Sequence, residues 1–226
     1  MIIGSDFIWL HIPKCAGMTM DHVLKTVFAA DPAIEIDPPD PHGAVVRHDT
    51  VVNREKRANR SLAGRERVAN LRRLPSWLLS KVFHEEKLSA LLMNQRAPKG
   101  VADSLAAAGP VFHTRTDMLE GTIYEQNGDR NRPDTYLLAY ESPKVDQWIR
   151  TEHIVEDFTA VFSRYAKLDP TVISAGFSEP RNRNDYTKDL AKWFTRSEMR
   201  ELYAKNPIWA ELERRLYGNL LFETMR

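Results

Sequence analysis

The feature that most constrains the fold is a short apolar run that ends in a proline and leads directly into an amphipathic segment. Residues 7–12, Phe-Ile-Trp-Leu-His-Ile, favour β-structure, and Pro13 ends the run. After Gly17, apolar residues recur at the spacing of one helical face: Met20, Val23, Leu24, Val27 and Phe28. We therefore predict a buried strand, a glycine-containing turn and a helix, as in the first unit of an α/β fold.

Helical and extended patterns alternate along the rest of the chain. A proline-started helix is predicted over 75–92, and short strands are predicted at 136–140 and 147–150. The second of these strands leads into a helix with an apolar face between 154 and 165. Residues 195–198, Thr-Arg-Ser-Glu, form a capping-box pattern before C-terminal helical segments.

Proline and glycine mark the expected connections. Four prolines indicate a loop over 31–43, and the polar run between 121 and 133 is an exposed loop or a substrate lid. Gly109 and Pro110 end an alanine-rich helix. The 226 residues show no internal repeat and suffice for one sizeable core. We predict a single α/β domain over residues 1–226, with a central, mostly parallel sheet flanked by helices.

The overall charge and the cysteine count exclude several classes of protein. The 32 Lys and Arg residues against 31 Asp and Glu residues leave a formal net charge of +1, which argues against a general nucleic-acid or anionic-membrane binder. The single cysteine cannot form an internal disulfide, and the N-terminus lacks a signal-peptide pattern, so a cytoplasmic location is expected. The longest apolar runs fall short of the roughly 20 residues that cross a bilayer.

Positive charge is concentrated in one segment. Between residues 47 and 73 there are nine basic and three acidic residues. The part from Arg54 to Arg67 is either a solvated helix or an electrostatic surface for an anionic acceptor or for phosphate groups. Aromatic residues are not interleaved with these charges, which does not favour nucleic acid.

The turn after the first strand has the chemistry of an anion site. A helix that starts there directs unpaired backbone N–H groups and its positive dipole end at one spot. Lys14 adds a charge, Gly17 allows close approach, and Thr19 adds a hydroxyl. Lys14 precedes the glycine, so the P-loop pattern of nucleoside triphosphatases is absent. The other interpretation is that Lys14 is a solvated lysine at an ordinary turn.

Residues 10–19, Leu-His-Ile-Pro-Lys-Cys-Ala-Gly-Met-Thr, resemble the signature His-Ile-Pro-Lys-Thr-Ala-Gly-Thr-Ser of sulfotransferases, particularly their carbohydrate branch. The resemblance implies that Lys14 stabilises the bridging oxygen of PAPS (3′-phosphoadenosine 5′-phosphosulfate) during sulfuryl transfer. Cys15 and Met18 replace threonines of the signature, so the side-chain contribution would come from Lys14 and Thr19. The residues that would bind the phosphosulfate are Pro13, Lys14, Cys15, Ala16, Gly17, Met18 and Thr19.

Two later segments also resemble this family. The signature Arg-x-Pro followed by a serine, which binds the 3′-phosphate, is similar to residues 72–80, Arg-Arg-Leu-Pro-Ser-Trp-Leu-Leu-Ser. Counting back from the proline selects Arg73, whereas the family's spacing of eight selects Arg72 with Ser80. The other interpretation is a surface arginine pair beside a proline-started helix. Residues 146–158 resemble a late strand-to-helix segment whose role in the family is architectural.

The acceptor hydroxyl must lose a proton during transfer, which requires a base. We select His48, because it lies between the two PAPS motifs, where some family members that act on polysaccharides have a histidine, and because Asp49 is its neighbour. A polar surface role is the alternative. His11, within the first signature, is more consistent with a structural role, and His42 and His113 have no assigned place.

Together these observations predict a PAPS-dependent sulfotransferase that acts on a carbohydrate or glycolipid hydroxyl. No metal is implied, because no group of Cys, His and acidic residues has ligand spacing. Two other functions stay open: a kinase-like nucleotide-phosphate enzyme, and a nucleotide-binding module without turnover. The acceptor and the oligomeric state are open as well.

Overall fold

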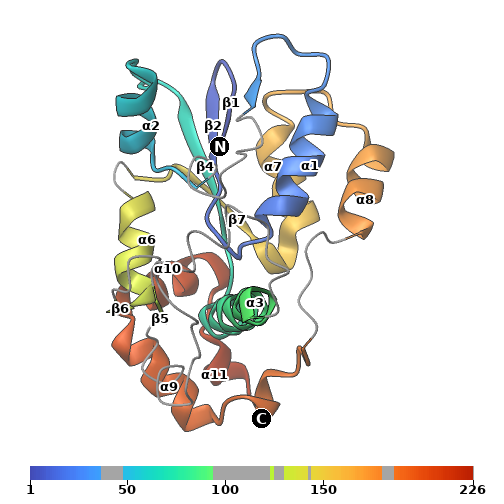
Figure 1. The fold of residues 1–226 in the computed structure, drawn as a ribbon. Helices are drawn as coiled ribbons and strands as arrows, with labels where there is room; N and C mark the ends of the chain where they lie inside the picture. The colour runs from blue at the N-terminus through green and yellow to red at the C-terminus, as the bar shows by residue number, and fades with distance from the viewer. Residues whose placement is uncertain (37–47, 94–122, 125–129, 142–143, 180–185, 226) are drawn as a thin grey trace. The chain divides into compact units, whose positions relative to one another are not determined.

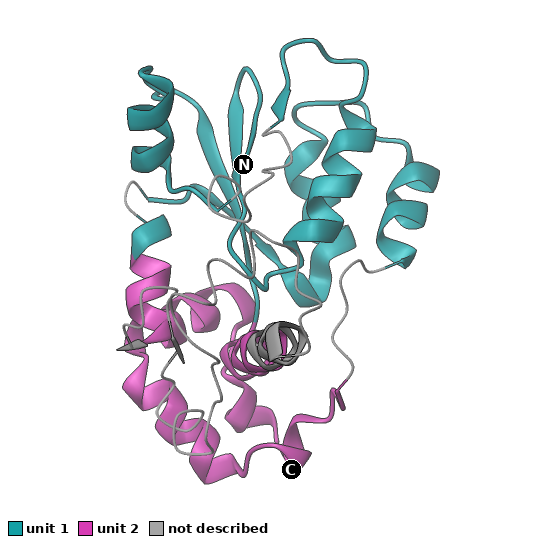
Figure 2. Cartoon of the chain, viewed as in Figure 1, with its two compact units in different colours: residues 1–40, 44–72, 139–183 teal, residues 41–43, 73–138, 184–226 magenta. Residues whose placement is uncertain are grey.

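A computed structural model describes residues 1–36, 48–93, 123–124, 130–141, 144–179 and 186–225. The chain divides into two compact units (Figure 2). Unit 1 comprises Met1–Asp40, Ala44–Arg72 and Ala139–Arg183, and unit 2 comprises Pro41–Gly43, Arg73–Leu138 and Asn184–Arg226. The expectation of a single sulfotransferase-like domain over residues 1–226 stays a prediction.

Unit 1 contains a five-stranded sheet with the order β3-β1-β2-β4-β7 (Figure 1). The strands are β1 (Ile2–Ile3), β2 (Phe7–Leu10), β3 (Glu35–Ile36), β4 (Glu66–Leu71) and β7 (Gln147–Arg150). The sheet is mixed, because β1 is antiparallel to β2 and β3, whereas β2, β4 and β7 are parallel. Leu10 pairs with Ala69, and Ala69 pairs with Trp148. The carboxyl ends of β2, β4 and β7 therefore lie at one edge of the sheet.

Helices flank the sheet of unit 1 (Figure 1). They are α1 (Gly17–Val27), α2 (Val51–Ala58), α7 (Ile154–Phe162, preceded by a 3₁₀ turn over Thr151–His153) and α8 (Pro170–Ser178). The apolar faces of α1 and α7 pack on the strands in one core cluster, to which Trp9, Val68 and Ile149 contribute from the sheet. Burial of these aromatic and aliphatic side chains is the main stabilising contribution. The predicted α/β class, with a central sheet flanked by helices, is confirmed.

Unit 2 is mainly helical. Its elements are α3 (Leu74–Met93), the antiparallel pair β5 (Ile123–Tyr124) and β6 (Arg130–Asn131), α6 (Pro133–Tyr140, whose last two residues belong to unit 1), a 3₁₀ turn (Leu190–Lys192), α9 (Arg196–Lys205), α10 (Pro207–Tyr217) and α11 (Leu221–Thr224). In its core, the ring of Trp77 contacts those of Trp209 and Tyr136. Asp134 accepts hydrogen bonds from the first N–H groups of α10.

Several sequence predictions are confirmed. The strand and helix after residue 7, the proline-started helix, the strand at 147–150 with its following helix, and the capping box of Thr195 and Glu198 are all present. The C-terminal apolar pattern is divided into α10 and α11 at Gly218, a residue with a φ of 77°.

Two predictions were wrong or incomplete, and one helix was missed. Residues 136–140, predicted as a strand, belong to helix α6, where Leu137 and Tyr140 are buried three residues apart and Leu138 is exposed. The loop predicted over 31–43 contains β3, because Glu35 and Ile36 pair with β1. Helix α8 was not predicted.

The central strand β4 was also missed, since charged residues precede its short apolar run and Asn70 interrupts it. Asn70 is nevertheless buried, because its Oδ1 accepts a 2.9 Å hydrogen bond from the indole N–H of Trp9. The alanine-rich helix before Gly109 and most of the loop over 121–133 lie outside the described residues. In the part of the chain that is described, no helix has the length and apolarity needed to span a membrane.

Candidate functional site

The turn between β2 and α1, residues 11–16, has an unusual backbone and is called the Lys14 turn. Lys14 and Ala16 have φ angles of 65° and 61°, in the left-handed region that residues other than glycine rarely adopt. Ala16 is the N-cap of α1 and provides no side-chain cap. The N–H groups of Ala16 and Gly17 have no acceptor among the described residues. Left-handed backbone and uncapped N–H groups are features of backbone anion sites.

Gly17 is required by the close approach of His11. A Cβ atom at Gly17 would lie 1.7 Å from Nε2 of His11, so the imidazole occupies the space that any other side chain would need. The His11 ring is only 3% exposed and lies against Trp9, with 5.1 Å between ring centroids. His11 therefore packs between the strand and the first turn of α1, in agreement with the structural role expected for it.

Cys15 joins the turn to the end of β4. Its side chain is fully buried, and burial raises the pKa of the thiol to about 12. The backbone N–H of Arg72 donates a hydrogen bond to the sulfur, and the charges of Arg72, Glu152 and Lys14 all act on it. The Lys14 turn and Arg72 thus lie close together at the carboxyl edge of the sheet, within unit 1. At neutral pH this thiol is protonated, so Cys15 is not a nucleophile.

The other positions of the turn differ in exposure. Thr19 is 5% exposed, whereas Met18 is partly exposed. Ser80 is 7% exposed and lies in α3 of unit 2. The sequence thus assigns to one site residues that belong to two units.

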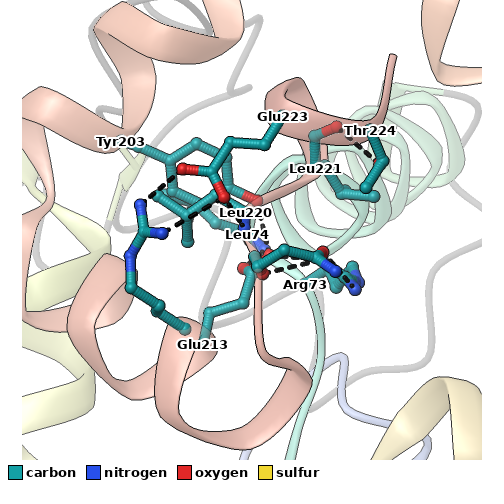
Figure 3. A network of polar contacts seen from close by, with 10 residues as sticks. Arg73, Leu74, Tyr203, Glu213, Leu220, Leu221, Glu223 and Thr224 are labelled. Atoms are coloured by element: carbon teal, nitrogen blue, oxygen red, sulfur yellow. Dashed lines mark hydrogen bonds and ion pairs between the residues drawn. The ribbon is translucent and has the colours of Figure 1, made fainter.

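Arg73 is held within unit 2 by a buried network (Figure 3). Its Nη1 lies 3.2 Å from Oε1 of Glu213 and also donates to the backbone oxygen of Asn219, whose Oδ1 accepts from Nη2. The guanidinium lies over the ring of Tyr217, 4.3 Å from its centroid. Arg73 therefore has a structural role in holding α10 and the turn after it at the start of α3.

Glu213 is the centre of this network. It has no exposed surface, and it accepts hydrogen bonds from the backbone N–H of Leu74 and the hydroxyl of Tyr203, at 2.8 Å and 2.6 Å. Burial and the neighbouring carboxylate both raise the pKa of Tyr203. Each oxygen of Glu213 has a donor, as a buried carboxylate requires.

His48 is held at two points. Its Nδ1 lies 2.8 Å from the backbone oxygen of His11, and its own backbone oxygen accepts a 2.8 Å hydrogen bond from the hydroxyl of Tyr140. The rings of His48 and His11 meet edge to face, 4.5 Å between centroids. The neighbouring Asp49 is buried and pairs with Arg57 at 2.9 Å. Sequence reasoning did not identify Tyr140, because it assigned residues 136–140 to a strand.

The basic segment is largely paired within unit 1. Arg54 and Arg60 both pair with Glu35. Arg65 donates to the backbone oxygen of Gly4, and Arg67 donates to that of Lys144. Only residues 51–58 of this region form a helix, and the segment then enters β4. Its role as an electrostatic surface stays a prediction.

The late strand-to-helix segment contains a second internal arginine pair. Nη2 of Arg150 donates to Oδ1 of Asp157 at 2.6 Å, while its Nε and its backbone N–H donate to Oδ2, each at 2.8 Å. Burial alone would raise the pKa of Asp157, but the hydrogen bonds from Arg150 outweigh burial and lower it. This clamp holds the start of α7 at the end of β7, in keeping with an architectural role.

Within the described residues, no three His, Cys, Asp or Glu side chains are grouped so that they could hold a metal ion. Comparisons of the chain with family models, with curated proteins and with solved structures find no significant match.

Proposed function

We propose that this protein is a sulfotransferase that moves the sulfuryl group of PAPS to a hydroxyl of a carbohydrate or glycolipid. The observation that carries the proposal is the junction at the carboxyl edge of the sheet, where the Lys14 turn after β2 meets Arg72 after β4 through Cys15. Ligands of α/β proteins commonly bind at this edge of the sheet. The two sequence motifs that resemble the PAPS signatures thus supply neighbouring groups.

The turn would bind the phosphosulfate of the donor. Backbone N–H groups at the start of α1 would donate to its oxygens, and the positive end of the helix dipole favours the anion. Lys14 would neutralise the charge that develops on the bridging oxygen, which is where fixed cations lower the barrier most.

The 3′-phosphate is assigned to Arg72 rather than Arg73. Arg73 pairs with Glu213, and removing it from that pair would leave a carboxylate buried without its cation. Arg72 borders the turn, and its spacing of eight residues to Ser80 matches the signature. An arginine fork binds phosphate through paired, charge-assisted hydrogen bonds.

His48 would act as the base. The acceptor oxygen attacks sulfur in line, a new S–O bond forms, and the S–O bond to the leaving phosphate breaks. The proton of the acceptor passes to His48, and 3′,5′-adenosine bisphosphate leaves with the electron pair of the broken bond. His48 is joined to the donor turn through the backbone oxygen of His11, which supports its placement near the reacting groups.

Transfer of labelled sulfate tests this function. The wild-type protein is incubated with ³⁵S-PAPS and a panel of oligosaccharides and glycolipids. We expect label on an acceptor, a loss of at least about 100-fold in Lys14→Ala, and a similar loss in His48→Ala with unchanged affinity for 3′,5′-adenosine bisphosphate. Lys25→Ala is the control, because Lys25 pairs with Asp21 on the surface of α1.

Other outcomes would contradict the proposal in different ways. Binding of the bisphosphate without label on any acceptor would identify a nucleotide-binding module without turnover. Phosphoryl transfer from ATP with Mg²⁺ would identify a kinase-like enzyme. Equal activity of Lys14→Ala and Lys25→Ala would show that Lys14 does not take part in transfer.

A further inference from the structure

His48 is bonded to two parts of unit 1 that lie far from it in the sequence. The backbone oxygen of His11, which faces Nδ1, is 37 residues away, and Tyr140, whose hydroxyl donates to the backbone oxygen of His48, is 92 residues away. Tyr140 is the last residue of α6 and is only 5% exposed. One contact therefore orients the ring, and the other fixes the backbone that carries it.

The contact with His11 determines where the ring proton lies. A backbone carbonyl oxygen only accepts hydrogen bonds, so the 2.8 Å contact requires a proton on Nδ1 of His48. In the neutral imidazole, the lone pair is then on Nε2. This is the tautomer in which Nε2 can take a proton while Nδ1 keeps its hydrogen bond.

The Tyr140 contact maintains this arrangement. If the backbone at His48 moved, Nδ1 would lose its alignment with the His11 carbonyl, and the ring would be free to adopt the other tautomer. Hydrogen bonds weaken steeply away from linear geometry, so a small displacement is sufficient. A buried tyrosine hydroxyl donating to a backbone oxygen is a rigid support, because its ring is fixed by packing.

We propose that Tyr140 is a positioning residue for His48: its hydroxyl holds the His48 backbone so that Nδ1 donates to the His11 carbonyl and Nε2 keeps the lone pair. This inference rests on the proposed function, since it is there that His48 is the base. Tyr140 does not contact the reacting groups in this account and acts only through His48.

The test is the tautomer of His48, measured by two-bond ¹H–¹⁵N correlation spectra of protein labelled with ¹⁵N-histidine. His48→Gln assigns the signal, because that variant lacks it. Tyr140→Phe removes only the hydroxyl. Tyr165→Phe is the control, because it removes a partly buried hydroxyl of unit 1 that bonds Glu66 at the start of β4, at the opposite edge of the sheet.

We expect the Nδ1–H tautomer of neutral His48 in the wild type and in Tyr165→Phe, and a mixture of both tautomers in Tyr140→Phe. We also expect Tyr140→Phe to bind 3′,5′-adenosine bisphosphate within about twofold of the wild type. An Nε2–H tautomer in the wild type, or an unchanged pattern in Tyr140→Phe, would overturn the proposal. A loss of bisphosphate affinity in Tyr140→Phe would also overturn it, by placing the effect on the donor turn.

The spectra are recorded without nucleotide, so they separate this inference from the proposed function. If the wild type shows the expected tautomer but binds no bisphosphate, the proposed function fails and the positioning of His48 by Tyr140 is retained. If the bisphosphate binds and the tautomer is the opposite one, the sulfotransferase proposal stands and the role of Tyr140 is rejected.

Discussion

Arg72 and Arg73 are neighbours in the chain, but they belong to different compact units and have different surroundings. Arg73 pairs with Glu213, a carboxylate without exposed surface that is 140 residues away. Arg72 instead bonds through its backbone to Cys15, beside Lys14. Arg73 lies against a buried acid within unit 2, whereas Arg72 and Lys14 lie at the Cys15 thiol beside the uncapped start of α1, where Glu152 also contributes a charge. The role of an arginine therefore depends on the partner that the fold brings to it.

The largest expected effect on nucleotide binding comes from breaking the turn itself. In Gly17→Ala the added Cβ would lie 1.7 Å from the His11 ring, so either the ring or the start of α1 must move. We expect loss of bisphosphate binding in calorimetry and a fall of about 3 kcal/mol in the free energy of unfolding. Gly218→Ala is the control, because its Cβ meets nothing within 4 Å and only the backbone is strained. Equal effects of the two substitutions would disprove the packing of His11 on Gly17.

The next effect concerns Arg73, whose charge is paired with the buried Glu213. Arg73→Ala leaves Glu213 buried without its cation, and we expect it to lower the free energy of unfolding in urea by about 3 to 5 kcal/mol. Arg214→Ala removes an ion pair with Glu223 at the surface of the same unit, where we expect a much smaller cost because solvent screens the pair. A cost for Arg73→Ala no larger than that for Arg214→Ala would show that the network does not hold unit 2 together.

Asp157 pairs with Arg150, a second arginine of the protein that is bound to an acid within its own unit. Its lowered pKa means that the folded state favours the carboxylate. The resulting stability is present above the unfolded pKa of about 3.9 and is lost as the pH falls through the folded value. We expect the wild type to exceed Asp157→Asn by about 1 to 3 kcal/mol at pH 7 in urea unfolding, and the difference to shrink below pH 4. A difference independent of pH would contradict the ion pair with Arg150.

The smallest effect concerns the buried sulfur beneath the turn. Because burial raises the pKa of Cys15 to about 12, the folded state keeps the thiol protonated where the unfolded chain has lost the proton. The contribution of Cys15 to the free energy of unfolding is fully present below the unfolded pKa of about 8.5 and decreases as the pH rises above it. Relative to Cys15→Ala, we expect the wild type to lose about 1 to 2 kcal/mol between pH 8 and pH 10. Parallel unfolding curves would show that the thiol is exposed to solvent.

The local patterns of the sequence predicted much of the fold. The strand after residue 7, the helix after Gly17 and the strand at 147–150 each have a periodicity or a terminal signal that does not depend on distant residues. Strand β4 could not be predicted in this way, since the burial of Asn70 depends on Trp9, 61 residues away. Residues 136–140 were assigned to a strand because a short apolar run fits both periodicities.

In the candidate site, too, the sequence could identify contiguous residues but not residues whose partners are distant in the chain. The Lys14 turn was recognisable because its residues are contiguous. The choice between Arg72 and Arg73 was left open by the sequence, because Glu213 and Asn219 are more than a hundred residues away and no local pattern links them to Arg73. Tyr140 was missed because residues 136–140 were assigned to a strand and because its partner His48 is 92 residues away in the chain.

The most direct test of the central claim is calorimetric titration with 3′,5′-adenosine bisphosphate, beside ATP and ADP, of the wild type, Arg72→Ala and Arg73→Ala. We predict selective binding of the bisphosphate by the wild type, a loss of about tenfold or more in Arg72→Ala, and near wild-type affinity for the folded fraction of Arg73→Ala. Absence of bisphosphate binding, or a preference for ATP, would contradict the sulfotransferase proposal. A loss confined to Arg73→Ala would contradict the division of roles between the two arginines.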